Sequence, residues 1–218
     1  MNHILLNILL SSADGPTAVF IAGRIGHLYM IGAILILLFF YAIYFIKMIA
    51  QKRRGIQTRQ LGKGKDKNIR TVEILISVTT LLIVPAQLLS IFLEWNLVPD
   101  AVRIIGSIIG FVGDLIFLTA VVTMRDSWRA GIPSEDKTEL ISEGIYRYSR
   151  NPAFLGFDLM YIGILLMYFN WILLVITILT VISLHLQILQ EEKFLVTAFG
   201  EEYIAYKQHT FRYFGRRK

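Results

Sequence analysis

Two polar clusters, separated by a long apolar run, hold the side chains of this sequence that are best suited to chemistry. The first, GIYRYSRNPAF at 144–154, combines two arginines, an Asn-Pro pair and three aromatic residues. The second, QEEKF at 190–194, brings two adjacent carboxylates, and more aromatic residues follow it. Carboxylates, a guanidinium and aromatic faces together suit a ligand that is zwitterionic, aromatic and cationic. The alternative interpretation is a pair of solvated helix ends joined by surface salt bridges.

The residues between the clusters indicate how the clusters meet. From Asn151 to Gln190 the only charged residue is Asp158. That run is too long for one membrane span of about 20 residues and suits two. Asn170, within YFNWI, supplies a turn, and its aromatic neighbours suit a membrane interface. We therefore expect a tight helical hairpin with legs at roughly 153–169 and 171–190.

In an antiparallel hairpin, the start of the first leg and the end of the second lie at the same membrane face. Arg150 and Asn151 should therefore lie near Glu191 and Glu192, so that two distant segments form one polar pocket. His185, in the second leg, has no further His or Cys at metal-ligand spacing. We therefore expect no metal site.

Composition agrees with a membrane protein. The chain has 218 residues, of which 55% are hydrophobic and 17% charged, values typical of a multi-spanning protein. Three more apolar runs, at 25–46, 74–93 and 104–124, are long enough to span, whereas the run at 4–10 is too short and should lie at the membrane surface. We predict an all-α integral membrane protein with about five transmembrane helices, the C-terminal hairpin and a cytoplasmic C-terminal helix.

Glycines and aspartates within the predicted spans indicate how the helices pack. In the third span, Gly106, Gly110 and Gly113 have the spacing that allows two helices to pack closely. Asp114 and Asp158 are ionisable groups at membrane depth, so they should face the protein interior. For Asp158, a structural hydrogen-bonding role and a place in the site wall both remain open.

The distribution of basic residues predicts orientation, because they mark the cytoplasmic side. They concentrate in the connector QKRRGIQTRQLGKGKDKNIR, in the loop after the third span and in the tail FRYFGRRK. The loop between the second and third spans instead carries Glu94 and Asp100. The N-terminus should then lie outside, and both polar clusters and the C-terminus should be cytoplasmic. The net charge of +6 is thus a topology signal, and we expect no nucleic-acid partner.

Two linked motifs give the chain a family resemblance. The first half, ELISEGIYRYSRNPAFLG, fits a glycine, a tyrosine, an arginine, an Asn-Pro pair, an aromatic residue and a glycine at fixed spacing. The second half, EEKFLVTAFGEEYIAY, is an acidic pair followed by FGEEY and a second tyrosine. This pattern resembles the isoprenylcysteine carboxyl methyltransferase family of integral membrane methyltransferases, with phospholipid methyltransferases as more distant relatives. The upstream segment SWRAGIPSEDKTELI is similar to the bacterial branch, which implies a bacterial inner membrane.

The resemblance implies an enzyme that transfers a methyl group from S-adenosylmethionine, held in a cytoplasmic pocket of the last two spans and the C-terminal segment. It implies one membrane domain, 1–218, with three spans in 1–124 and a cofactor-binding loop, the hairpin and a cytoplasmic segment in 125–218. The segment implied to wrap the cofactor is Thr138, Glu139, Leu140 and Ile141. The residues implied to line it or form the loop against it are Tyr146, Asn151, Pro152, Ala153 and Phe154.

The resemblance also implies roles for charged and polar residues that contact the cofactor or the methyl acceptor. Glu191 would bind a polar group of the cofactor, and Arg150 would orient a carboxylate of substrate or cofactor with its two-pronged guanidinium. Gln187 stands at the substrate position where prenylcysteine-specific members carry an arginine. The acceptor is then a small lipophilic or lipidated molecule with a carboxyl, thiol, amine or phenol, and membrane lipids are further partners. The alternatives are a sterol-reductase-like enzyme that uses NADPH and a non-catalytic lipid-binding membrane protein.

Overall fold

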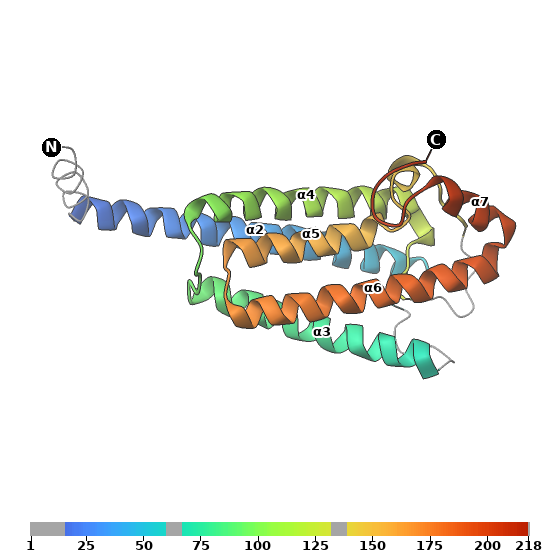
Figure 1. Ribbon diagram of the computed structural model, residues 1–218, viewed down its shortest axis with the longest axis horizontal. Helices are drawn as coiled ribbons and strands as arrows, with labels where there is room; N and C mark the ends of the chain where they lie inside the picture. The colour runs from blue at the N-terminus through green and yellow to red at the C-terminus, as the bar shows by residue number, and fades with distance from the viewer. Residues whose placement is uncertain (1–15, 60–66, 132–138, 218) are drawn as a thin grey trace.

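The computed structural model describes residues 16–59, 67–131 and 139–217, and in the first helix it describes side chains from Gly26 onward. These parts of the chain form long helices that lie side by side (Figure 1). Within the described ranges, β-structure is limited to two isolated bridges, Arg59 with Ala130 and Thr210 with Arg216. The predicted all-α class is confirmed. The predicted surface segment 4–10 lies outside the described residues.

The helices follow the apolar runs, because a helix satisfies its backbone polar groups internally where lipid offers no partners. In chain order they are α2 (Pro16–Arg53), α3 (Lys67–Phe92), α4 (Asp100–Met124), α5 (Pro152–Met167), α6 (Trp171–Phe199) and α7 (Glu201–His209). Two short 3₁₀ turns, η2 (Arg125–Ser127) and η3 (Gly144–Arg147), lie between α4 and α5. Helix α6 extends past the predicted end at 190, because Glu and Lys are good helix formers and the helix stops only at Gly200, where φ is 53°.

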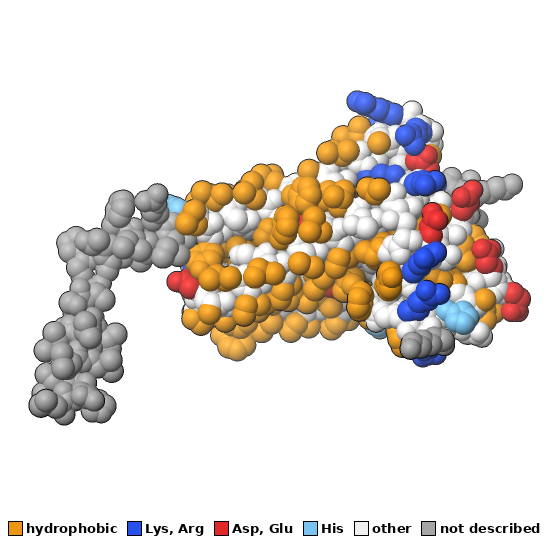
Figure 2. All heavy atoms as spheres, turned by 90° about the horizontal axis from the view of Figure 1, so that it is seen from above, with side chains coloured by type: hydrophobic (Ala, Val, Ile, Leu, Met, Phe, Trp, Pro, Cys, Tyr) orange, Lys and Arg blue, Asp and Glu red, His pale blue; other side chains and the backbone are white. Residues whose placement is uncertain are grey.

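Long apolar helices make this an integral membrane protein. Four stretches are long and apolar enough to cross a membrane: Gly26–Arg53, Lys67–Phe92, Asp100–Ser127 and Trp171–Phe199. Helix α5, with 16 residues, is about 24 Å long, shorter than the roughly 30 Å of a bilayer core, so the fifth span stays a prediction. Apolar side chains cover the middle of the molecule, while charged side chains gather at the end where α7 and the C-terminus lie (Figure 2).

Helices α4 and α5 pack closely through glycines. A Cβ placed on Gly113 would lie 2.7 Å from the backbone nitrogen of Met160, and one placed on Gly106 would lie 2.7 Å from the carbonyl oxygen of Gly163. Backbone therefore lies directly against backbone, and only glycine fits at these positions. The predicted close packing through the third-span glycines is confirmed, and it fixes the position of α5.

The turn between α5 and α6 lies where it was predicted. The Asn170 side chain accepts a hydrogen bond from the backbone nitrogen of Leu173 at 2.9 Å, which caps α6, and donates one to the Ser90 hydroxyl at 2.9 Å. The two legs run antiparallel, but α5 packs mainly on α4 and α6 mainly on α3 (Figure 1). The hairpin is therefore open rather than tight, because the glycine seam draws α5 towards α4. Asp114 and Asp158 are buried, as predicted.

Candidate functional site

The two polar clusters meet at the charged end of the bundle, as the hairpin predicted. The Arg150 guanidinium (Nη2) donates to the Glu192 carboxylate (Oε1) at 2.7 Å, and the Asn151 amide donates to the same oxygen at 3.4 Å. Both members of the ion pair are buried, with side-chain exposures of 7% and 5%. The contact is thus an interior ion pair rather than a solvated surface salt bridge.

The C-terminal segment completes this contact. The Arg212 guanidinium binds both carboxylate oxygens of Glu192, at 3.0 Å from Nε and 2.9 Å from Nη2. The second terminal nitrogen of Arg150 donates to the carbonyl oxygens of Thr210, at 2.7 Å, and Lys207, at 3.2 Å. We call Arg150, Asn151, Glu192 and Arg212 the Glu192 clamp. It ties the start of α5, the end of α6 and the C-terminal tail together.

Glu191 lies on a different face of α6, because successive residues of an α-helix point about 100° apart. It lines a small pocket of about 100 Å³ beside the clamp. The predicted site residues that line this pocket are Tyr146, Arg150, Asn151, Ala153, Phe154 and Glu191. The structure therefore brings together most of the residues that the two motifs singled out.

Other lining residues of the small pocket were not predicted. They come from the end of α4, from the segment after it and from α6: Met124, Ser127, Trp128, Arg129, Gly131 and Leu195. The sequence carried a signal for some of them, since SWRAG directly follows the third span and belongs to the segment that is similar to the bacterial branch. Phe194, the aromatic residue of the second polar cluster, also lines the pocket, as predicted.

Part of the predicted cofactor-wrapping segment lies at the edge of the small pocket. The backbone nitrogen of Glu139 donates to the Ser127 hydroxyl at 3.3 Å, which brings this segment to a lining residue. Leu140 and Ile141 follow and are half-buried, and neither lines the pocket. Pro152 is buried at the first position of α5. Thr138 lies outside the described residues.

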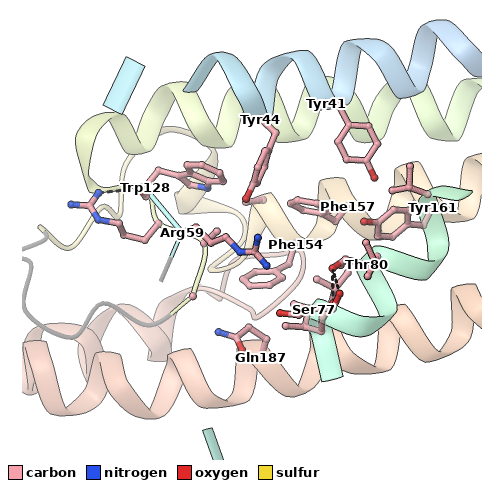
Figure 3. A pocket seen from close by; sticks show the side chains of 18 of the residues that line it. Tyr41, Tyr44, Arg59, Ser77, Thr80, Trp128, Phe154, Phe157, Tyr161 and Gln187 are labelled. Atoms are coloured by element: carbon pink, nitrogen blue, oxygen red, sulfur yellow. Dashed lines mark hydrogen bonds between the residues drawn. The ribbon is translucent and has the colours of Figure 1, made fainter. Parts of the chain in front are cut away.

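A larger cavity of about 390 Å³ adjoins the small pocket, between α2, α3, α5 and α6 (Figure 3). Its walls are mainly aromatic and aliphatic, and the aromatic residues include Tyr41, Tyr44, Phe157 and Tyr161. The residues that line both cavities are Trp128, Arg129, Gly131, Ala153 and Phe154. The two spaces therefore share a wall, one reaching into the apolar bundle and the other at its charged end.

Gln187 and Glu191 connect the two cavities. Gln187 lines the larger one and Glu191 the smaller one, and the Gln187 amide donates to the Glu191 carboxylate at 3.1 Å. The Gln187 side-chain oxygen is buried and has no hydrogen-bond partner within the described part of the chain. A buried acceptor of this kind is costly unless a ligand or water donates to it.

The tyrosines at the charged end are hydrogen-bond donors rather than bases. Burial, with a smaller contribution from nearby Tyr206 and Glu191, raises the pKa of Tyr146 far above its ordinary value. The Tyr146 hydroxyl contacts the Met124 sulfur at 3.3 Å, and the Tyr206 hydroxyl donates to the Tyr146 carbonyl at 2.6 Å. Burial also raises the pKa of Tyr203 to about 12. These phenols therefore stay protonated at neutral pH.

Arg150 has fewer free donors than a ligand-binding arginine needs. One terminal nitrogen binds Glu192 and the other binds the carbonyl oxygens of Thr210 and Lys207. Its Nε is buried without a partner within the described residues. The carboxylate that it holds here is that of Glu192, and its assignment to a carboxylate of substrate or cofactor stays a prediction. Among the described residues, no group of three His, Cys, Asp or Glu side chains could hold a metal ion.

Comparisons with known proteins now give the family. Residues 102–202 match the phospholipid methyltransferase family. A probable protein-S-isoprenylcysteine O-methyltransferase of Oryza sativa subsp. japonica is 31% identical over 150 residues, which cover 65% of this chain and 78% of the relative. The protein-S-isoprenylcysteine O-methyltransferase of Saccharomyces cerevisiae is 30% identical over 117 residues, 52% of this chain and 49% of the relative. The chain belongs to the isoprenylcysteine O-methyltransferase family and is a methyltransferase embedded in the membrane.

Proposed function

We propose that this chain transfers a methyl group from S-adenosylmethionine to a lipophilic acceptor at the charged end of the bundle. The observation that carries the proposal is the pair of adjoining cavities, joined by the Gln187–Glu191 hydrogen bond. A soluble donor and a lipophilic acceptor require two spaces of different polarity with one shared wall. The small pocket at the charged end suits the donor, and the larger cavity suits the acceptor.

The residues of the small pocket fit the donor in chemistry. Glu191 can accept hydrogen bonds from an amino or hydroxyl group, and the rings of Tyr146, Phe154 and Trp128 can hold a sulfonium by cation–π contact. The described pocket is smaller than the roughly 300–1,000 Å³ of a usual ligand site. We therefore propose that it holds one part of the donor and that residues 138–141 wrap the remainder.

S-adenosylmethionine supplies, when bound, a methyl group already activated for transfer. A lone pair of the acceptor forms the new bond to the methyl carbon, the carbon–sulfur bond breaks, and S-adenosylhomocysteine leaves. The chain mainly holds the two partners in line, a contribution on the order of 7–11 kcal/mol. A carboxylate acceptor is already anionic at neutral pH and needs no base to remove a proton before it attacks the methyl group. We propose a carboxylate, in accord with the isoprenylcysteine in the names of the relatives.

We also propose that this end of the molecule is cytoplasmic and the N-terminus external, in a bacterial inner membrane. Lys and Arg side chains gather with the site at one end (Figure 2), and basic residues favour the cytoplasmic side. Arg54 of the connector pairs there with Asp126, and Arg212 of the tail pairs with Glu192. Modification of single introduced cysteines from each side of intact cells would test the orientation, since the natural chain has none.

The test of the proposed function is donor binding followed by transfer. Calorimetry of the purified chain should show saturable binding of S-adenosylhomocysteine, and Glu191→Gln should weaken it by roughly 10- to 100-fold, the value of a lost charged hydrogen bond. Glu202→Gln, an exposed change in α7, is the matched control. Labelled methyl transfer to N-acetyl-S-farnesylcysteine, with phosphatidylethanolamine as the competing acceptor, tests the second half. Failure of the folded wild type to bind S-adenosylhomocysteine would refute the proposal.

A further inference from the structure

Arg59 of the α2–α3 connector places a positive charge in the larger cavity. Figure 3 shows its side chain directed into the space near Phe154, a residue that also lines the small pocket. The described lining residues include two arginines, Arg59 and Arg129, and no carboxylate. The cavity is therefore cationic at one end and apolar over most of its remaining wall, which complements an amphiphile with an anionic head.

The two arginines differ in how far their guanidinium groups are already used. Arg129 donates to the backbone oxygen of Trp128 at 2.9 Å and to that of Asp126, so it stabilises the segment after α4. No ion pair or side-chain hydrogen bond of Arg59 is found within residues 16–59, 67–131 and 139–217. Among the residues that the structure describes, Arg59 is thus the arginine of this cavity whose guanidinium is not already engaged.

The backbone that carries Arg59 is held firmly although its side chain is not. The Thr58 carbonyl accepts from the backbone nitrogen of Ala130 at 2.9 Å, and the Thr58 hydroxyl donates to the Gln51 side-chain oxygen at 2.7 Å. The Gln51 amide in turn donates to the Trp128 carbonyl at 2.9 Å. Gln51 and Thr58 are both buried. The backbone position of Arg59 is therefore fixed, so a ligand has to order only the side chain, which limits the entropy cost of binding.

Two hydroxyls of the cavity wall are already used within their own helix. The hydroxyls of Ser77 and Thr80 donate to carbonyls of their own helix, at 2.7 Å to Glu73 and 2.6 Å to Ile76. The opposite walls are rings of α2 and α5 (Figure 3). A hydrocarbon chain therefore fits the depth of the cavity, and an anionic head fits the end near Arg59.

We propose that Arg59 binds the carboxylate of the acceptor and determines specificity for acidic over neutral amphiphiles. The inference rests on the proposed function and supplies, from a different element, the positive charge that Gln187 does not provide. A guanidinium on one carboxylate oxygen leaves the other oxygen free to form the new bond to the methyl carbon. The electron pair of the broken carbon–sulfur bond stays on sulfur, so an anionic acid and a sulfonium become a neutral ester and a thioether. The ester no longer pairs with Arg59, which favours product release.

Equilibrium binding without any methyl donor tests this inference. The probes are N-acetyl-S-farnesylcysteine, its methyl ester and its primary amide, titrated into the full chain in nanodiscs of neutral lipid. The wild type should bind the acid at least about tenfold more tightly than the ester or amide, as expected for a charge-assisted contact. Arg59→Gln should remove this preference, and Arg59→Lys should retain part of it, since lysine keeps the charge but not the planar fork. Arg54→Gln, a change in an exposed ion pair on the same connector, should leave the preference unchanged.

Several outcomes would overturn the assignment. Equal binding of acid, ester and amide by the wild type would show that no cation selects the head group. If Arg59→Gln still preferred the acid, another residue would recognise the head group. If Arg129→Gln lost the preference and Arg59→Gln did not, Arg129 would be that residue. In turnover, Arg59→Gln should raise KM for the acid far more than it lowers kcat. Binding of S-adenosylhomocysteine should be unchanged in Arg59→Gln, so failure of this inference is distinguishable from failure of the proposed function.

Discussion

Removal of the Glu192 carboxylate should destabilise the chain more than removal of any exposed charge. Glu192 accepts four hydrogen bonds, from Arg150, Asn151 and twice from Arg212. In Glu192→Ala the Arg150 guanidinium remains buried with carbonyl partners only, and breaking a buried pair in this way costs about 3–5 kcal/mol. Arg212, with 34% of its side chain exposed, can return to water and contributes little. We therefore expect the lower part of that range, about 3 kcal/mol.

The measurement is thermal unfolding of the full chain in detergent, at one fixed scan rate because membrane proteins often unfold irreversibly. For a chain of this size, about 3 kcal/mol corresponds to a fall in Tm of roughly 6–12 °C. The control is Arg54→Ala, which removes an ion pair with Asp126 of the same 2.7 Å length but with side chains 64% and 47% exposed. An exposed pair contributes about 0–1 kcal/mol, so this Tm should fall by no more than a few degrees.

Equal, small losses of stability in the two variants would refute the claim that the buried Glu192 ion pair stabilises the chain more than the exposed Arg54–Asp126 pair. That outcome would mean that water screens the Glu192 clamp as well as it screens Arg54 and Asp126. A second readout addresses the tail alone. Trypsin should cleave after Arg216 and Arg217 faster in Glu192→Ala than in the wild type, because the clamp ties Arg212 to α6. Unchanged cleavage would show that the tail stays bound without the carboxylate.

Three further predictions concern the helices and the small pocket. Gly163→Ala should cost roughly 1–3 kcal/mol in thermal unfolding, because the added Cβ meets α4 backbone, whereas Gly32→Ala, whose Cβ would lie 3.9 Å from the nearest side chain, should be neutral. Asn170→Ala should lower the free energy of unfolding by about 1 kcal/mol through loss of the α6 cap, measured in the same assay. An unchanged Tm would show that the cap does not stabilise the chain. Tyr146→Phe keeps the ring, so the calorimetric Kd for S-adenosylhomocysteine should change by no more than about twofold. Tyr146→Ala should raise this Kd by roughly tenfold, the value of a lost ring contact. Equal Kd values for the two variants would contradict a stacking role for the ring.

The sequence predicted best those features that local chemistry determines. The turn at Asn170 depends on one capping side chain beside aromatic residues, and both signals lie within a few positions. The seam between α4 and α5 depends on small residues spaced by about one helical turn, which can be read directly from Gly106, Gly110 and Gly113. The meeting of Arg150 with Glu192 follows from the length of the apolar run, because a hairpin returns the chain to the face it left.

Features that depend on packing between distant elements were not predicted. The hairpin opens because α5 is held by α4 and α6 by α3, a preference that hydropathy does not encode. The larger cavity is lined by residues of α2, α3, α5 and α6, with Gln187 among them. Arg59 reaches it through buried hydrogen bonds of Thr58 and Gln51, which no motif marks. In the sequence, Arg59 is one of several basic residues in a connector. A topology signal explains it there as well as a ligand-binding role does.

The geometry of one helix explains how the adjacent acidic residues come to differ. Neighbours on α6 point about 100° apart, so Glu192 faces the tail and Glu191 faces the small pocket. Arg150 and Asn151 of the clamp directly precede Ala153 and Phe154, which form the wall shared by both cavities. The clamp therefore fixes the start of α5 and, through it, the wall between the two cavities. Under the proposed function, this wall separates a donor from an acceptor of opposite polarity: Glu191 is left for the ligand, and Glu192 holds the wall in place.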